Sequence, residues 1–229
     1  MSNIYNWGKY KLKLIISKNN FISNFEITGA SKILELDYGH LNSVKTGYAI
    51  DTNNNRIPWF TYPAIEYLSQ LNFSDKKMLE WGSGNSSIFF GKRVNRIYSV
   101  EHNNEWYVKV KEYNIKNQHL VFTNEKDYAM TAYDFKVTFD IILIDGIKRD
   151  ECGLVALKLL NTSGMIILDN SDRYPDISAK FRSENLIQID FHGFGPINNY
   201  SWTTSIFLNR DFNFKPMDRQ PIIPIGGGY

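Results

Sequence analysis

The stretch Met78-Leu-Glu-Trp-Gly-Ser-Gly-Asn-Ser-Ser87 joins an apolar run to two glycines, Gly82 and Gly84, and then to residues that suit the start of a helix. Glycine is needed where a chain turns sharply and where a ligand must touch the backbone with no Cβ in the way. A helix that starts directly after such a turn offers unpaired amide donors. The stretch therefore predicts a strand, a tight turn and a helix, with a ligand site at the turn.

Around this turn, short β-rich runs alternate with helix-like segments, a pattern typical of a parallel sheet with crossover helices. The predicted strands cover residues 77–80, 96–101, 119–122, 139–145, 165–169, 186–191 and 202–208. The predicted helices cover residues 62–71, 86–94, 104–114, 150–160 and 174–183. The last two strands have no helical segment between them and are therefore predicted to pair antiparallel. We expect an α/β fold of Rossmann-like type, mostly parallel with an antiparallel C-terminal strand, and with helices on both faces.

The remaining segments flank this core. Residues 1–60 are predicted to form an N-terminal extension that packs on the core over the open edge of the sheet. Residues 61–209 form the predicted ligand-binding core. Residues 210–229 contain three prolines and end in three glycines and Tyr229, which predicts an irregular tail.

Composition narrows the class of protein. Hydrophobic residues make up 43% and charged residues 22% of the 229 residues, which favours a globular fold over a disordered chain. A net charge of +2, from 26 basic and 24 acidic residues, provides no basic stripe, so we expect no nucleic-acid partner.

The compartment is predicted from three absences. No apolar run reaches the roughly 20 residues that cross a bilayer, and Met1–Lys13 lacks the pattern of a secretion signal. The single cysteine, Cys152, cannot form an internal disulfide and is expected to be a packing residue in a helix. We therefore expect a cytoplasmic protein with no membrane partner, whose oligomeric state the sequence leaves open.

The predicted strand 96–101 ends in Ser99-Val-Glu-His102, which places a carboxylate beside the glycine turn. An acid at this position can accept both hydroxyls of a ribose. A nicotinamide dinucleotide site uses the same strand, turn, helix and acid. However, its third glycine would fall near Ser87, and no glycine occurs until Gly91. S-adenosyl-L-methionine (SAM) carries no phosphate and does not need that glycine.

These two segments resemble motif I and its acidic partner strand in class I SAM-dependent methyltransferases. The chain is further similar to a bacterial group of that superfamily with which it shares three more motifs. They are Pro58-Trp-Phe-Thr-Tyr-Pro-Ala-Ile-Glu66, Asp145-Gly-Ile-Lys-Arg-Asp-Glu-Cys152 and Asp169-Asn-Ser-Asp-Arg173. The resemblance runs from about Pro58 to Leu208 and implies a class I methyltransferase fold with SAM as the methyl donor.

The resemblance also implies where the cofactor binds. Glu80, Gly82 and Gly84 would line the methionine end of SAM, and Glu101 would hold the ribose. The other cofactor-binding candidates are Ser83, Asn85, Ser86, His102, Asn124 and Asp145. For the adenine pocket, Asn124, Glu125 and Asp127 are alternatives among which the sequence does not choose.

Two further strands end in polar residues at the same predicted edge, Asp145 after one and Asp169 with Asn170 after the other. Three such oxygen ligands suit Mg²⁺ or another divalent cation. The set is similar to the metal site of catechol-type O-methyltransferases, in which a lysine stands three positions after the first aspartate, as Lys148 does here. In the alternative interpretation, Asp145 orients the amino group of SAM, Lys148 is solvated, and Asp169 and Asn170 cap a helix.

The catalytic candidates are Asp145, Lys148 and His192. We expect His192 on a glycine-rich loop that leaves the strand 186–191, where it would serve as a general base or merely shape a turn. Four aromatic residues are either walls of an acceptor pocket or simple core: Trp59, Phe60, Tyr62 and Trp202.

The function favoured on resemblance is SAM-dependent O-methylation of a small polar acceptor, such as a sugar or a related metabolite. A nitrogen acceptor remains open. The alternatives are a nicotinamide-dependent oxidoreductase and a non-catalytic partner subunit with the same fold.

Overall fold

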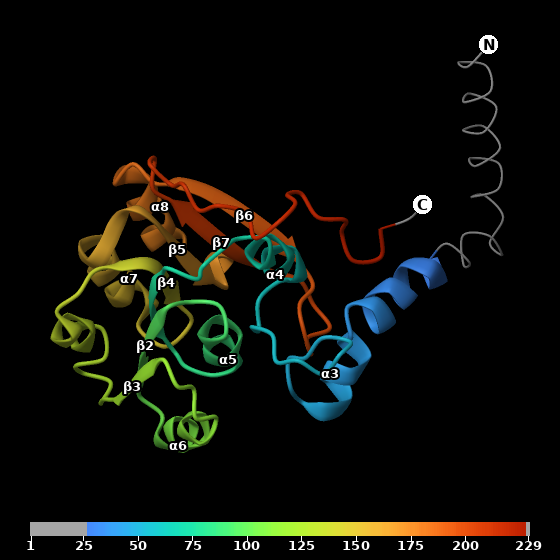
Figure 1. Cartoon of the computed structure of the whole chain (residues 1–229), viewed down its shortest axis with the longest axis horizontal. Helices are drawn as coiled ribbons and strands as arrows, with labels where there is room; N and C mark the ends of the chain where they lie inside the picture. The colour runs from blue at the N-terminus through green and yellow to red at the C-terminus, as the bar shows by residue number, and fades with distance from the viewer. Residues whose placement is uncertain (1–26, 228–229) are drawn as a thin grey trace, which may run out of the picture.

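Seven strands form a single sheet in the computed structural model, which describes residues 27–227 (Figure 1). The strands are β1 (Lys77–Trp81), β2 (Arg96–Glu101), β3 (Gln118–Phe122), β4 (Phe139–Ile144), β5 (Leu160–Asp169), β6 (Ile187–Gly193) and β7 (Trp202–Leu208). Their order is β3-β2-β1-β4-β5-β7-β6, and β7 runs antiparallel to both of its neighbours. The predicted fold class is confirmed.

Each predicted strand is present, and its ends lie close to the predicted ones except in β5. This strand starts at Leu160 rather than Met165 because Leu160 pairs with Phe139 ahead of a register shift. The predicted antiparallel pair, β6 and β7, is also present, with β7 inserted between β5 and β6.

The helices follow the predicted alternation. They include η1 (Ile33–Asp37), α3 (His40–Thr46), α4 (Tyr62–Ser69), α5 (Asn85–Gly91), α6 (Asn104–Glu112), η2 (Met130–Phe135), α7 (Arg149–Leu159), η3 (Ser171–Arg173) and α8 (Pro175–Ser183). Local signals set several boundaries. Helix α6 begins after Asn103, whose side chain accepts a hydrogen bond from the amide of Trp106 at 2.9 Å. Helix α8 begins with Pro175, which fits the first turn because it lacks an N–H group.

Both faces of the sheet are covered by helices. Along β1, Met78 packs toward α4 and α5, whereas Leu79 packs toward α7 and α8. The same alternation continues in β4 and β5, as expected for strands whose side chains point to opposite faces in turn. Phe89 and Phe90 of α5 are buried. Because both faces are covered, a ligand can approach the sheet at the ends of its strands.

The segments outside the sheet and its helices pack around α4 and α5. The ring of Tyr38 lies 4.4 Å from the ring of Tyr62, and the side chain of Asn85 donates to the main-chain oxygen of Ala49 at 2.9 Å. The described part of the C-terminal tail runs beside α4 without a helix or strand of its own apart from one bridge to Leu71, and it buries Phe214 (Figure 1).

The predictions for the two ends of the chain concern, in part, residues that the structure does not describe. The segment Met1–Lys13 and the first 26 residues of the predicted extension lie outside the described residues, as do residues 228–229 of the tail. Within residues 27–227, no helix combines the length and the apolar character that crossing a bilayer requires.

Candidate functional site

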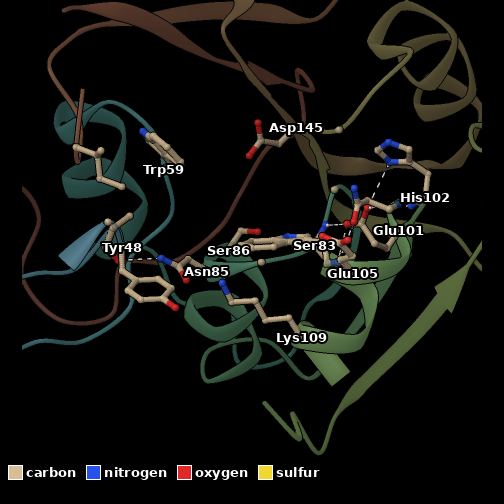
Figure 2. A pocket seen from close by; sticks show the side chains of 18 of the residues that line it. Tyr48, Trp59, Ser83, Asn85, Ser86, Glu101, His102, Glu105, Lys109 and Asp145 are labelled. Carbon is tan, nitrogen blue, oxygen red and sulfur yellow. Dashed lines mark hydrogen bonds and ion pairs between the residues drawn. The ribbon is translucent and has the colours of Figure 1, made fainter. Parts of the chain in front are cut away.

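A cavity of about 1000 Å³ lies at the carboxyl ends of β1, β2 and β4 (Figure 2). It is formed by the turn 82–86, the β2 end with the first turns of α6, the β4 end at 145–147, the segment 46–49, Trp59 and Ile197. Open α/β sheets bind ligands at this edge. The volume is at the upper end of the range of about 300–1,000 Å³ typical of small-molecule pockets.

The glycine turn is held close to the end of β4. Gly82 has a φ angle of +90°, and a Cβ there would lie 2.8 Å from the main-chain nitrogen of Gly146. A side chain at this position would therefore meet both an unfavourable backbone conformation and a clash. This contact brings the β1 turn and the β4 end into one wall of the cavity.

Glu101 joins the glycine turn to β2. One carboxylate oxygen accepts from the amide and the hydroxyl of Ser83, each at 3.0 Å. The other accepts from the amides of His102 and Asn103, each at 2.9 Å. Ribose hydroxyls that bind Glu101 would have to share the carboxylate with these donors, and the Ser83 hydroxyl is the one that can rotate away.

Glu80 lies beneath the turn and does not line the cavity. Its carboxyl group is fully buried and accepts hydrogen bonds from the hydroxyls of Ser86, Ser87 and Ser99. Burial raises the pKa of Glu80 to about 7, and the three hydroxyl donors oppose that rise. Glu80 therefore supports α5 from below. The resemblance implied instead that it would line the methionine end of SAM.

Trp106 covers part of the turn. Its indole N–H donates to the main-chain oxygen of Ser83, and a Cβ on Gly84 would lie 3.3 Å from the ring. Trp106 is 36% exposed and forms part of the cavity wall. The absence of a side chain at Gly84 therefore lets this aromatic ring lie against the backbone.

Asp145 is the predicted catalytic residue that lines the cavity. Its carboxylate accepts from Arg149 at 3.0 Å, and its side chain is 26% exposed. Partial burial raises the pKa of Asp145 to about 6, although the positive charge of Arg149 acts in the opposite direction. An acid with a pKa near 6 is suited to accept a proton near neutral pH.

The guanidinium of Arg149 contacts two of the three side chains that were predicted to bind a metal ion, Asp145 and Asn170. This guanidinium donates to the main-chain oxygens of Asp145, Gly146 and Asp169 and to the side chains of Asp145 and Asn170. Asp169 is 3% exposed and points its carboxylate at Trp202 and Thr204, at 3.0 and 2.6 Å. Burial, and then the charge of Asp145, raise the pKa of Asp169 to about 7.

These contacts do not fit a divalent ion held by Asp145, Asp169 and Asn170. The carboxylate of Asp169 is engaged by Trp202 and Thr204, and the guanidinium of Arg149 already pairs with Asp145. Among residues 27–227, no three His, Cys, Asp or Glu side chains are grouped so that they could hold a metal ion.

Three other predicted site residues lie away from the cavity. Lys148 precedes α7 and pairs with Glu151 at 3.4 Å. His192 lies within β6, not on the loop expected after it, and its Nδ1 atom contacts the Thr203 hydroxyl at 2.7 Å in a separate small depression. Asn124 is exposed and bonds to Asp127.

The four aromatic candidates separate into two groups. Trp59 is 45% exposed and lines the cavity, whereas the rings of Phe60, Tyr62 and Trp202 are buried. Cys152 is buried in α7 as predicted, and burial raises the pKa of its thiol to about 12. A thiol with that pKa is not a nucleophile at neutral pH.

Sequence reasoning missed several residues of the cavity. Glu105, Trp106 and Lys109 belong to the first turns of α6, directly after the acidic strand end, and this position could have indicated them. Tyr48 carried no such signal because it reaches the cavity only through the path of the N-terminal segment.

Comparisons with known proteins identify the fold. No protein-family model and no curated protein matches this sequence. The precorrin-6y C5,15-methyltransferase of Geobacter metallireducens is 16% identical, with a TM-score of 0.51 over 63% of this chain and 85% of that chain. A Streptococcus mutans protein solved with S-adenosylhomocysteine (SAH) is also 16% identical, with a TM-score of 0.48 over 62% of this chain and 94% of that chain.

A methyltransferase of Pyrococcus furiosus is 19% identical, with a TM-score of 0.48 over 64% of this chain and 81% of that chain. At such identities the likeness concerns the fold. The chain has the Rossmann-like sheet of class I methyltransferases, and its reaction has to be inferred from the site.

Proposed function

We propose that this protein is a SAM-dependent methyltransferase that methylates an oxygen of a small polar acceptor, such as a sugar or a related metabolite. The observation that carries the proposal is that the Gly82–Gly84 turn, Glu101 and Asp145 line one cavity. Two glycines that let a ligand approach the backbone and an acid for ribose hydroxyls suit this cofactor, and Asp145 lies beside them.

In the proposed complex, each part of the cofactor would lie against a different part of the cavity wall. Glu101 would accept the ribose hydroxyls, with His102 beside it, while the backbone of the turn faces the amino-acid end. The ring of His102 packs edge-on against Tyr128, with centroids 5.4 Å apart, and this contact fixes the wall next to Glu101. SAM, when bound, supplies a methyl group that its sulfonium already activates, so the main task of the protein is to align the acceptor.

Asp145 is the proposed proton acceptor for an acceptor hydroxyl. It lines the cavity and lies on the strand end next to the glycine turn, whereas Lys148 and His192 lie elsewhere. Its pKa of about 6 leaves it ionised at neutral pH and able to take a proton. Arg149 would hold its carboxylate in place during that transfer.

A nicotinamide dinucleotide is the competing cofactor, and one contact argues against it. The amide of Gly84, at the start of α5, donates to the hydroxyl of Ser87 at 2.9 Å. That amide is one of the donors that a pyrophosphate would need at a helix start. Here it is satisfied within the protein by the residue that replaces the third glycine.

Calorimetric titration with SAH and with NAD⁺ tests the proposed function directly. We expect SAH to bind and NAD⁺ not to bind. Incubation with methyl-labelled SAM and pooled sugars, sugar phosphates and phenols would then identify the acceptor. Binding of NAD⁺ in place of SAH would refute the proposal, and binding of SAH without transfer to any acceptor would favour the partner-subunit alternative.

A further inference from the structure

Two cations lie around Tyr48 at the end of the cavity away from Glu101 and His102 (Figure 2). Lys109 lines the cavity, and its ammonium nitrogen is 4.8 Å from the ring centre of Tyr48 and 4.4 Å from that of Trp106. The guanidinium carbon of Arg56 is 3.7 Å from the same tyrosine ring. Positive charge is therefore concentrated on one side of the cavity.

Among residues 27–227, neither cation has an acidic partner, because none of the five ion pairs described there involves Arg56 or Lys109. The Nη1 atom of Arg56 is buried and has no hydrogen-bond partner in the described part of the chain. Contacts with aromatic rings attract the charges but leave their N–H groups without acceptors.

Two acids of the same segments, Asp51 and Glu105, do not pair with either cation. The carboxylate of Asp51 accepts from the amides of Asn53 and Asn55, each at 2.8 Å, and closes its own turn. Glu105 stands one helical turn before Lys109 and also lines the cavity, yet it is in none of the five ion pairs described within residues 27–227. The charge on Lys109 is therefore available to a ligand.

We propose that Tyr48 and Lys109, backed by Arg56, form a subsite for an anionic group, a carboxylate or a phosphate, inside the cavity. This inference rests on the proposed function for the cavity as a whole. The Lys109 ammonium and the Tyr48 hydroxyl would bind the anion. Arg56 is a positioning residue, because it does not line the cavity but packs on the ring of Tyr48.

The anion has two chemical sources, the α-carboxylate of the cofactor and an acidic group on the acceptor. Calorimetry with SAH and 5′-methylthioadenosine, which lacks the amino-acid part, tests the first source. Titration of the SAH complex with glucose 6-phosphate, with glucose as the neutral control, tests the second. The variant is Lys109→Met, and the matched control is Lys111→Met on the same helix, whose side chain lies over Tyr107 and does not line the cavity.

If the cofactor carboxylate binds here, Lys109→Met weakens SAH at least tenfold and leaves 5′-methylthioadenosine unchanged. If the acceptor supplies the anion, the variant leaves both nucleosides unchanged and loses at least tenfold in affinity for glucose 6-phosphate, while glucose binds neither protein. Lys111→Met should match the wild type in every titration. Tyr48→Phe, which keeps the ring that Arg56 contacts, should show a smaller loss for the same ligand.

The subsite is refuted if Lys109→Met and Lys111→Met give the same affinities for all four ligands. It is also refuted if the wild-type protein binds glucose and glucose 6-phosphate equally well and Lys109→Met leaves the affinity for SAH unchanged. The proposed function fails separately, if neither SAH nor 5′-methylthioadenosine binds the wild-type protein. In that case, titration of the ligand-free protein with inorganic phosphate still tests the subsite, because loss of binding in Lys109→Met would support it.

Discussion

Arg149 donates to both the main-chain oxygen and the carboxylate of Asp145, at 3.0 Å in each case. The same guanidinium reaches the main-chain oxygen of Asp169 and the side chain of Asn170. One side chain therefore joins the ends of β4 and β5 and fixes an acid that lines the cavity. The arrangement makes a tightly bound metal unnecessary for holding these strand ends together.

Replacing Arg149 should destabilise the protein. Arg149→Met leaves the partly buried Asp145 without its partner, so we expect a loss between the ~1 kcal/mol typical of exposed pairs and the ~3–5 kcal/mol of buried ones. Urea unfolding measures it. Lys148→Met is the control, because its ion pair with Glu151 is more exposed, and it should cost under about 1 kcal/mol. Equal losses in the two variants would contradict a special role for Arg149.

Metal removal should have no effect on the proposed donor site. We expect exhaustive chelation with EDTA to change neither the affinity for SAH nor the melting temperature, because Arg149 takes the place of a cation beside Asp145. Turnover on an identified acceptor should also survive. If added Mg²⁺ raised the melting temperature of the wild type and not that of Asp145→Asn, a metal site at Asp145 would have to be reinstated.

Gly82→Ala should cost more than Gly47→Ala. Both positions have positive φ angles, +90° and +68°, so each alanine carries a strain of roughly 1–2 kcal/mol. Only at Gly82 would the new Cβ also clash, 2.8 Å from the Gly146 nitrogen, whereas at Gly47 no atom of the described residues beyond its chain neighbours lies within 4 Å. Comparing the thermal unfolding of the two variants separates the cost of backbone strain, which both carry, from the cost of the clash, which only Gly82→Ala carries. A Gly47→Ala variant as unstable as Gly82→Ala would show that the close approach of β1 and β4 is unimportant.

Glu101→Gln should weaken SAH by more than tenfold, because charged hydrogen bonds to the ribose are worth roughly 1.5–3 kcal/mol. Glu105→Gln, which changes another acid of the same cavity, should have little effect. Ser83→Ala provides a second check, since it removes a hydroxyl that competes for the Glu101 carboxylate and should not reduce affinity. A folded Glu101→Gln protein with unchanged SAH affinity would place the ribose elsewhere.

Stability should fall as pH rises from about 4.5 to 7 because of Glu80. Its pKa is raised from 4.5 to about 7 in the folded protein, so the contribution of its neutral form is complete below pH 4.5 and is lost as pH rises through 7. The free energy of unfolding should fall by an amount on the order of 3 kcal/mol over this range. Glu80→Gln should flatten this part of the unfolding curve, measured by urea at several pH values, whereas Glu112→Gln on the exposed side of α6 should not.

Asp145 and Asp169 act in the same direction. Their pKa values are raised to about 6 and about 7, so part of the decline with pH should persist in Glu80→Gln. If wild-type stability instead rose steadily between pH 5 and 7, these carboxyl groups would not be buried as the structure places them.

The alternation of strands and helices was determined by the sequence alone. Apolar runs such as 141–144 are buried on both faces of the sheet, and a short continuous apolar run of this kind predicts a buried strand. The turn at Gly82 and the acid at Glu101 were likewise predictable, because parallel strands bring their carboxyl ends to one edge. Each of these features depends only on the sequence of a few neighbouring residues and on the rule that parallel strands end at the same edge of a sheet.

Tertiary structure alone decided which of the polar residues at that edge face the cavity. Asp169 and Asp145 both end central strands, yet Trp202 and Thr204 of β7 turn the Asp169 carboxylate away. Tyr48 enters the cavity from a segment distant in sequence, and His192 is excluded because β6 lies at the edge of the sheet. Side-chain direction at a strand end depends on partners contributed by other segments, and those partners are set by long-range packing that no local pattern contains.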